Sequence, residues 1–240
     1  MNYKWSKFNH LLKISLFPQP CILCNAASGN ELGLCSACLS DLPFHQNGLC
    51  PQCALPSTNN LICGACIASP PDFDATRPIF RYEYPISQLV QHYKYGQQLH
   101  LGDLFARLLQ GKLLQHKLSA QTFPDLIIPM PLHPKRLTER GFNQSLEVAK
   151  ILGKVFNIPV DYTACQRTKH SPPQASLPLK QRATNIKGAF KCTKSLTGLR
   201  VALIDDVMTT GASLNALAKA VKAKGASHVE CWVIARTLLD

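Results

Sequence analysis

The sequence predicts an α/β fold, in which a parallel sheet is flanked by helices and preceded by a small Cys-rich domain. From residue 71 onward, strand-like and helix-like patterns alternate, and this order favours a parallel sheet joined by right-handed crossovers. Val201–Ile204 is continuously apolar, as expected for a strand covered on both faces. Eight of the eleven cysteines lie between residues 21 and 66, which sets this segment apart from the rest of the chain.

Changes in composition divide the chain into three segments. Residues 1–20 are predicted to form an N-terminal amphipathic helix that ends before Pro18, residues 21–70 the Cys-rich domain, and residues 71–240 the α/β domain. The apolar stretch LLKISLF is short and is interrupted by Lys13, so a signal peptide is not expected. No apolar run approaches the roughly 18 residues of a membrane span, so we expect a cytoplasmic protein without one.

The first half of the α/β domain contains two predicted strands and two predicted helices. Arg77–Tyr84 alternates apolar and polar residues as a strand does, and Leu126–Ile128 is a short apolar run that also indicates a strand. Ser87–Lys94 is expected to be a short helix. Leu101–Lys117 is expected to be a longer one, because its leucines recur at helical spacing.

The second half of the domain continues the alternation. Val160–Tyr162 and Val229–Ile234 are predicted strands, and Leu214–Lys224 is a predicted helix. Arg167–Ala189 has no clean period and contains three prolines, which indicates a long loop that is either functional or disordered. Asn143–Phe156 is predicted to be a helix whose buried face carries Leu146, Ala149, Leu152 and Val155.

The formal net charge of +12 is distributed unevenly along the chain. Residues 1–70 carry a net charge of +1, whereas residues 133–200 contain thirteen Lys and Arg residues against three acidic ones. A solvated basic face is the ordinary explanation of such a segment. Because this one lies between two motif segments, we also expect phosphate-rich or polyanionic ligands.

The Cys-rich segment contains four C-x-x-C pairs, which are a strong signal for metal binding. Two thiolates on one C-x-x-C turn bind an ion side by side, and two such turns complete the tetrahedral shell of four sulfurs that zinc accepts. Sequential pairing is the simplest connectivity for two structural zinc sites, and interleaved pairing stays open. The predicted ligands are Cys21, Cys24, Cys35, Cys38, Cys50, Cys53, Cys63 and Cys66.

Disulfides and a redox dithiol are the alternatives to zinc at these cysteines. Disulfides need an oxidising compartment, which the missing signal-peptide pattern disfavours. A redox C-x-x-C normally begins a helix in a thioredoxin-like unit and does not occur as four tandem copies. Closed sites with four sulfur ligands leave no position open for a substrate, so their role is structure or partner binding.

The segment VALIDDVMTTGAS, at Val201–Ser213, predicts a site for a ribose 5-phosphate group, that of phosphoribosyl pyrophosphate (PRPP) above all. The strand places Asp205 and Asp206 at its carboxyl end, where open parallel sheets bind ligands. The two carboxylates would repel a phosphate, so they suit ribose hydroxyls or Mg²⁺. A buried strand followed by a polar helix cap does not explain these adjacent carboxylates. The turn that would hold the phosphate at the helix N-terminus consists of Thr209, Thr210, Gly211, Ala212 and Ser213.

Several further segments accompany this motif. They are the Cys pairs, VQHYKYG at Val90–Gly96, IPMPLHPKRLTERGFNQS at Ile128–Ser145, and Arg167–Phe190. Together they resemble the ComF family, which joins a zinc-ribbon domain to a phosphoribosyltransferase domain. The motif at Val201–Ser213 is specific for the phosphoribosyltransferase superfamily, and RGFNQ with the Cys pairs is specific for ComF. The resemblance covers nearly the whole chain and implies a type I phosphoribosyltransferase-like fold preceded by a double zinc ribbon.

The resemblance also implies how the site is arranged. Asp205 and Asp206 would hold the ribose hydroxyls with Mg²⁺ nearby, and the turn after them would hold the 5-phosphate. The loop Arg167–Ala189 would close over the site and exclude water. A pyrophosphate loop after the strand Leu126–Ile128 would bind the diphosphate through charge-assisted hydrogen bonds. Its residues are Leu132, His133, Lys135, Arg136 and Arg140.

The implied reaction is displacement of pyrophosphate from C1 of PRPP, in which the protein positions groups and neutralises the leaving diphosphate. No protein nucleophile is required, and no general base is evident. The candidates for a catalytic role are Arg140, His170 and Arg182. Two hypotheses stay open: an active phosphoribosyltransferase of nucleotide metabolism, and a PRPP- or nucleic-acid-binding module that has kept the fold and lost or repurposed the chemistry.

The resemblance to ComF implies a role in natural competence, through uptake of single-stranded DNA into the cytoplasm. The expected partners are PRPP, single-stranded DNA and a competence helicase or translocase, with the protein cytoplasmic or peripheral at the inner membrane. The basic segment 133–200 is one candidate for the DNA contact. The zinc domain is the other, and its nearly neutral charge favours a protein partner instead.

Overall fold

The computed structural model describes residues 19–46, 48–96, 98–117, 123–169, 186 and 188–238. The chain forms two compact units, Met1–Pro43 and Phe44–Asp240. The second half of the Cys-rich segment therefore belongs to the same unit as the sheet, and this division does not coincide with the domain boundary expected near residue 70. The helix predicted before Pro18 lies outside the described residues.

The first unit contains one pair of Cys knuckles. A turn closes at the first knuckle, where the amide of Asn25 donates to the carbonyl of Cys21 over 2.8 Å. The short helix α2 (Ser36–Ser40) begins directly after Cys35, whose sulfur accepts a hydrogen bond from the amide of Cys38. Leu34 is fully buried beside this knuckle. So small a unit buries few apolar side chains, which fits stabilisation by a metal ion.

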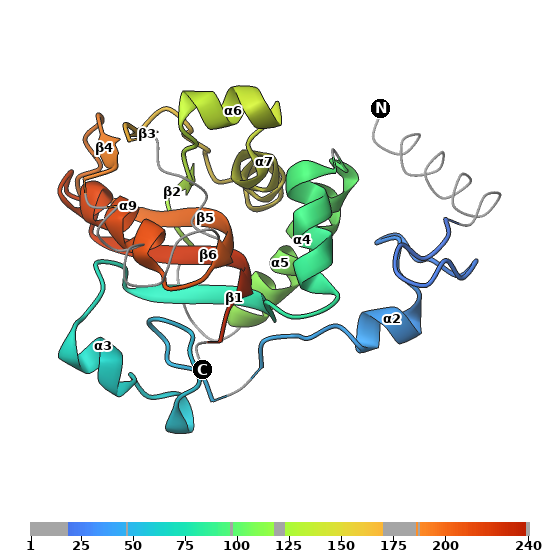
Figure 1. Ribbon diagram of the computed structural model, residues 1–240. Helices are drawn as coiled ribbons and strands as arrows, with labels where there is room; N and C mark the ends of the chain where they lie inside the picture. Colours follow the sequence, from blue (N-terminus) through green and yellow to red (C-terminus); the bar gives the residue numbers. More distant parts are fainter. Residues whose placement is uncertain are drawn as a thin grey trace. The chain divides into compact units, whose positions relative to one another are not determined.

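The second unit is built on a four-stranded parallel sheet, drawn in Figure 1. The order of the strands is β1 (Ala75–Arg81), β6 (His228–Arg236), β5 (Arg200–Met208) and β2 (Leu126–Pro129). All neighbouring pairs are parallel, as the sequence predicts. All four strands therefore end at the same edge of the sheet, which brings together the residues that follow them.

Helices cover the sheet on both faces. They are α5 (His100–Lys117), α7 (Gln144–Phe156) and α9 (Ala212–Lys222), while α4 (Ile86–Tyr95) packs against α5. Helices α5 and α7 contact each other and pack on one face, whereas α9 packs on β5, β6 and a separate hairpin (Figure 1). Buried side chains from one face of β5 and β6 form a hydrophobic cluster with those of α9, and the predicted core residue Cys231 is fully buried in it.

Some expected elements differ from the observed ones. Strand β1 begins at Ala75 and ends at Arg81, so the expected span Arg77–Tyr84 is displaced toward the C-terminus. Strand β5 continues through the acidic pair as far as Met208 and does not end at Ile204. The strand expected at Val160–Tyr162 is reduced to a single parallel bridge between Val160 and Ile127.

Helix α6 (Pro134–Arg140) and the hairpin of β3 (Cys165–Arg167) and β4 (Phe190–Cys192) in the α/β unit were not predicted from the sequence. Helix α6 occupies part of the expected pyrophosphate loop, with Pro134 at its start and Gly141, at φ +82°, at its end. Strands β3 and β4 form an antiparallel hairpin at the two ends of the expected long loop. Of that loop, residues 170–185 and 187 lie outside the described residues.

The buried face of α7 also differs from the predicted one. The structure buries Ser145, Val148 and Ala149 together with Leu152, whereas Val155 is 45% exposed. The face is rotated because the first turn of α7 directs polar side chains toward the end of β5. Hydrophobic spacing alone does not register this polar contact.

Two short helical segments complete the second Cys-rich region. They are the 3₁₀ turn η1 (Thr58–Asn60) and helix α3 (Gly64–Ala68), which begins immediately after Cys63.

Candidate ribose-phosphate site and metal centres

The acidic pair lies near the carboxyl end of β5 and is held by groups from two helices. The ammonium of Lys94, from α4, lies 2.8 Å from Oδ1 of Asp206. The hydroxyl of Ser145, from α7, donates to Oδ1 of Asp205 over 3.4 Å, and the amide of Asp206 donates to the same oxygen over 2.9 Å. The sequence predicts the position of both carboxylates but neither of these side-chain partners.

The two carboxyl groups of the pair have different electrostatic surroundings, because Lys94 pairs with Asp206 alone. Burial raises the pKa of Asp205 to about 7, and the neighbouring charge of Asp206 adds to this effect, while Lys94 opposes it. Burial acts to lower the pKa of Lys94, but the charge and hydrogen bond of Asp206 outweigh it, and the pKa is raised. Lys94 is therefore a protonated counter-charge for Asp206, whereas Asp205 changes charge near neutral pH.

The turn after β5 leads into α9 without a side-chain cap. Gly211 occupies the cap position at φ +82° and is buried, and an added Cβ would lie 2.8 Å from the terminal methyl of Met208. The hydroxyl of Thr210 accepts a hydrogen bond from the amide of Ala212. The cap residue supplies no oxygen to the helix, so this N-terminus suits an anionic ligand.

The RGFNQ segment connects α6 to α7 and is fixed by hydrogen bonds. The side chain of Asn143 caps α7 by accepting from the amide of Leu146, and it donates to the carbonyl of Met130 over 3.0 Å. The buried hydroxyl of Tyr93 donates to the backbone carbonyl of Gln144 over 3.0 Å. These bonds join α4, the end of β2 and α7 around the acidic pair.

Arg140 is oriented by two neighbours. Its guanidinium donates to Oε1 of Gln144 over 2.6 Å and lies 5.2 Å from the centre of the Tyr95 ring. The amide nitrogen of the same Gln144 is buried and has no hydrogen-bond partner within the described part of the chain. A buried donor without a partner is costly, and a ligand oxygen is one group that would satisfy it.

The β3–β4 hairpin brings a further guanidinium to the acidic pair. Arg167 lies 5.7 Å from the centre of the Phe190 ring, and its buried Nε has no partner among the described residues. Burial lowers the pKa of Arg167, the charge of Asp205 opposes this, and the charge of Arg136 lowers it further. Two guanidinium groups therefore repel each other here, an arrangement that an anion between them would relieve.

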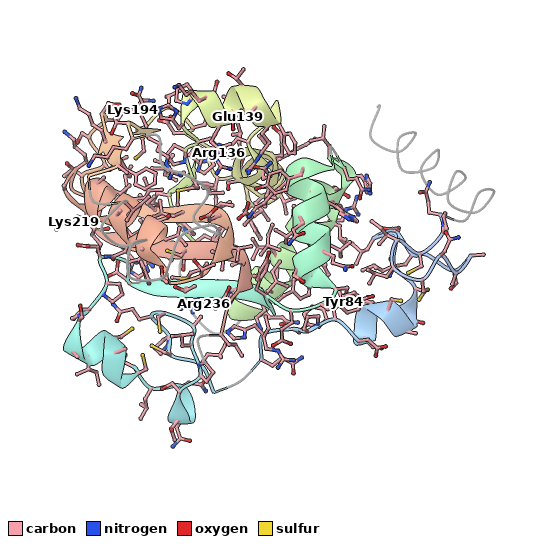
Figure 2. All side chains as sticks on the ribbon, in the orientation of Figure 1. Tyr84, Arg136, Glu139, Lys194, Lys219 and Arg236 are labelled. Atoms are coloured by element: carbon pink, nitrogen blue, oxygen red, sulfur yellow. The ribbon has the colours of Figure 1, made fainter. Side chains whose placement is uncertain are left out.

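The remaining predicted site residues have other roles or lie elsewhere. The Nδ1 atom of His133 caps α6 by accepting a hydrogen bond from the amide of Lys135. The side chain of Lys135 is exposed, and Leu132 is partly buried. Glu139, between Lys135 and Arg140 on α6, is exposed (Figure 2). His170 and Arg182, two of the three catalytic candidates, lie outside the described residues.

The cysteines form two groups with sequential pairing. The first is Cys21, Cys24, Cys35 and Cys38, the second is Cys50, Cys53, Cys63 and Cys66, and within each group all sulfurs lie within 4.8 Å of one another. Contacts of 3.7 Å between Cys24 and Cys35, and of 3.6 Å between Cys53 and Cys63, are close to the roughly 3.8 Å edge of a tetrahedral zinc–sulfur shell with bonds of about 2.3 Å. The ligand sets fit structural zinc, and the interleaved alternative is wrong.

Backbone amides favour the thiolate form of one cysteine in each group, Cys21 and Cys50, whereas the pKa is raised for Cys38, Cys53 and Cys66. Burial acts to raise the pKa of Cys21, but hydrogen bonds from backbone amides outweigh it and lower the pKa to about 6. In the second group the amide of Cys63 donates to the sulfur of Cys50 over 3.4 Å. Thiolates are the form that binds zinc.

Comparison with known proteins agrees with both parts of the chain. Residues 12–67 match the double zinc ribbon domain family, and residues 143–238 match the phosphoribosyl transferase domain family. The DNA utilization protein YhgH of Escherichia coli K12 is 32% identical over 224 residues, which cover 92% of this chain and 98% of the relative. Competence protein F of Haemophilus influenzae is 32% identical over 84% of this chain and 96% of its own. Competence protein ComFC of Bacillus subtilis is 23% identical over 85% of this chain and 84% of its own.

The chain belongs to the ComF family. Its α/β unit is the phosphoribosyltransferase-like part of a ComF protein, and its two groups of four cysteines are the double zinc ribbon. Among the described residues of this ComF protein, no helix is both long and apolar enough to cross a membrane.

The residues that sequence reasoning missed in this ComF chain are those with distant partners. Lys94 lies within the VQHYKYG segment, yet no residue near it in the sequence indicates that it pairs with a carboxylate 112 positions later. Ser145 and Gln144 end the quoted Ile128–Ser145 segment, and their polarity on the buried side of a helix is the signal that could have identified them. A buried Arg236 at the end of an apolar strand carries a similar signal.

Proposed function

We propose that this ComF protein binds PRPP or ribose 5-phosphate at the carboxyl end of β5 and acts in natural competence, in the uptake of single-stranded DNA into the cytoplasm. The observation that carries the ligand proposal is the acidic pair Asp205–Asp206, partly neutralised by Lys94, near the end of the strand that leads to the N-terminus of α9, where the cap residue Gly211 has no side chain. Carboxylates there suit ribose hydroxyls, and the helix N-terminus suits the 5-phosphate.

The surrounding cations support a diphosphate in the same site. The charge of Arg136 repels that of Arg167, the charge of Asp205 attracts it, and Gln144 orients the guanidinium of Arg140. We assign the diphosphate of PRPP to these guanidinium groups, which bind phosphate oxygens in a bidentate manner. The carboxylates of Asp205 and Asp206 are the oxygen ligands that Mg²⁺ accepts, and the ion would supply further charge neutralisation to the bound diphosphate.

Isothermal titration calorimetry tests this assignment. Titration of the full chain with ribose 5-phosphate and with PRPP, each with and without Mg²⁺, is expected to give one site per chain. Asp206→Asn is expected to weaken binding at least about tenfold, because it removes a ribose acceptor and breaks the Lys94 pair. The matched control is Glu147→Gln, which removes a partly exposed carboxylate on α7. Binding by Asp206→Asn as tight as that of the parent would exclude the site.

An active phosphoribosyltransferase of nucleotide metabolism is the second candidate. The cluster of guanidinium groups favours it, because neutralising a leaving diphosphate is the main chemical demand of such a reaction. The assay is release of pyrophosphate from PRPP in the presence of a panel of purine, pyrimidine and amine acceptors. PRPP binding without release across the panel would assign the site a binding role instead.

The names of the relatives support the proposal of competence. One relative is a DNA utilization protein and two are competence proteins, and all three align over most of the chain. The basic segment 133–200 contributes exposed cations such as Lys135, Lys150 and Lys191, the last on β4. Single-stranded DNA is the partner that we assign to this segment, and a competence helicase or translocase at the inner membrane is the protein partner.

A salt titration separates a DNA site from a general basic surface. The triple variant with Ala at Lys135, Lys150 and Lys191 is expected to bind single-stranded DNA more weakly and with a shallower salt dependence. The control carries Ala at Lys219 and Lys222, which lie on α9 outside the segment; Lys219 is labelled in Figure 2. Equal loss in both variants would indicate nonspecific attraction to net charge.

Transformation frequency tests the biological role. Disruption of the gene in its host is expected to reduce natural transformation, and the parent chain is expected to restore it. Complementation with Asp206→Asn then decides whether the ribose-phosphate site is needed for uptake. Normal transformation in the disrupted strain would remove the competence assignment and leave the enzyme candidate.

A further inference from the structure

Arg236 is an almost fully buried arginine in the last position of β6, with 1% of its surface exposed (Figure 2). It pairs in register with Met208, the last residue of β5. No acidic side chain pairs with it within the described part of the chain. A buried guanidinium is costly unless its donors are satisfied and its charge is balanced, so its partners identify what it does.

The partners of Arg236 are backbone carbonyls on two sides. One nitrogen donates to the carbonyl of Met208 over 3.0 Å and also to the carbonyl of Thr209, which is the first residue of the turn toward α9. It donates in addition to the carbonyl of Thr237 over 3.0 Å. On the other side, Nε donates to the carbonyl of Cys53 over 2.9 Å. One side chain thus joins the ribose-phosphate turn to a ligand residue of the second four-cysteine group.

The knuckle that carries Cys53 is bound to the α/β unit along its whole length. The carbonyls of Pro51 and Gln52 accept from the amide and hydroxyl of Thr76 on β1, over 3.2 and 2.6 Å. The carbonyl of Ala54 accepts from Nε2 of His45 over 2.6 Å. With the Arg236 bond, four successive carbonyls of one knuckle are used, so a shift of this knuckle would break several bonds at once.

A second contact leads from the same knuckle to the same turn. The side chain of Gln52 donates to the carbonyl of Phe73 over 3.1 Å. Phe73 is buried and belongs to the cluster that contains Met208, and its ring lies 3.8 Å from where a Cβ on Gly211 would be. The position of the turn therefore depends on the knuckle through both a polar and an apolar contact.

We propose that the second four-cysteine centre, when it holds its metal, fixes the ribose-phosphate turn through Arg236, so that loss of metal there loosens the turn and weakens phosphate binding. Four thiolates around one Zn²⁺ carry a net negative charge, which also balances the buried guanidinium. Arg236 is a positioning residue, because it contacts the backbone of the turn and not the ligand. This inference rests on the proposed ribose-phosphate site.

Hydrogen exchange and ligand binding on the full zinc-loaded chain test the proposal together. Cys66→Ser removes a ligand of the second centre, and Arg236→Lys keeps the charge but cannot reach carbonyls on both sides. Both are expected to speed amide exchange in peptides covering residues 205–213 and to weaken ribose 5-phosphate binding about fivefold or more. The matched control is Cys38→Ser in the first centre, which should reduce bound zinc equally and leave both readouts unchanged.

Removal of zinc from the parent protein gives the same test without a variant. Peptides 205–213 are expected to exchange faster once the second zinc is lost, while peptides in β2 report whether the unit stays folded. By linkage, saturating ribose 5-phosphate should raise the equilibrium affinity of one of the two centres for zinc, as measured by competition with a chelator. Unchanged exchange at 205–213 after loss of the second zinc overturns the proposal. Absence of ribose 5-phosphate binding by the parent refutes the proposed function instead, and the exchange data still decide the role of Arg236.

Discussion

The ammonium of Lys94 lies 2.8 Å from Oδ1 of Asp206, and this pair joins α4 to the end of β5. Both side chains are largely buried, with 20% and 13% of their surfaces exposed. Lys94 therefore neutralises one of two adjacent carboxylates directly before a turn suited to a phosphate. An acidic pair without this counter-charge would repel the anionic ligand and would be costly to bury.

Lys94→Met is expected to lower the free energy of unfolding by about 1–3 kcal/mol, because it leaves Asp206 partly buried and unpaired. Urea unfolding at neutral pH measures the change. Lys150→Met is the control, since Lys150 pairs with Glu147 on an exposed helix surface and should change stability by less than about 0.5 kcal/mol. Equal effects of the two substitutions would contradict a special role for the Lys94 pair.

Asp205→Asn is expected to make the stability of the free protein less dependent on pH. Burial raises the pKa of Asp205 from its ordinary value of 3.8 to about 7 in the folded protein. The contribution of this carboxyl to stability is therefore fully present below about pH 4 and is lost progressively as pH rises to about 7. As pH rises from about 4 to 7, the Tm of the parent should therefore fall relative to that of the variant. Above about pH 7, the difference between the two Tm values should stay constant. A constant difference from about pH 5 to 8 would show that Asp205 does not titrate in this way.

The parallel sheet could be predicted because its strands and helices carry strong local patterns. The apolar run Val201–Ile204 and the period of Leu101–Lys117 both lie within the observed β5 and α5. Helix α6 was missed because it is short and polar, although Pro134 at its start and Gly141 at its end are ordinary boundary signals. The β3–β4 hairpin was missed because strands of three residues have too little pattern to detect.

Local sequence patterns predict the candidate site only where its residues are adjacent in the sequence, and Arg136 and Arg140 are expected there through the resemblance to ComF. Asp205, Asp206 and the turn after them form one local motif, and their position at the end of a parallel strand follows from the fold. Lys94, Ser145 and Arg167 reach the same place from other elements, and no local rule states which polar side chains the topology brings together. A partly buried Lys or Ser on a helix is identified as part of a site only once its partner is known.

Gly211→Ala is expected to disturb the turn more than an equivalent change elsewhere. Gly211 and Gly141 both have φ of +82°, where a Cβ costs about 1 kcal/mol or more. A Cβ at Gly211 would also lie 2.8 Å from the methyl of Met208, whereas at Gly141 no atom lies within 4 Å. Gly211→Ala should therefore destabilise the protein by about 1 kcal/mol more than Gly141→Ala, and only Gly211→Ala should also weaken ribose 5-phosphate binding. Thermal unfolding and calorimetry measure these two effects, and equal losses would show that backbone strain alone matters.

Arg167→Met is expected to change the preference of the site for PRPP over ribose 5-phosphate. The Nε of Arg167 is buried without a partner among the described residues, and its charge faces Asp205 and Arg136. A diphosphate would satisfy this nitrogen and separate the two guanidinium groups, whereas ribose 5-phosphate carries no diphosphate at C1. The variant should therefore lose about tenfold or more in affinity for PRPP and much less in affinity for ribose 5-phosphate.

The matched control for Arg167→Met is Lys191→Met, which removes an exposed cation from the other strand of the same hairpin. Calorimetric titration of each variant with both ligands gives the ratio of the two Kd values, which cancels any general loss of folded protein. If Arg167 acts only by holding the hairpin against Phe190, both affinities will fall together and the ratio will stay that of the parent. A preference for PRPP that falls in Arg167→Met and not in Lys191→Met places the guanidinium next to the diphosphate, because only that contact distinguishes the two ligands.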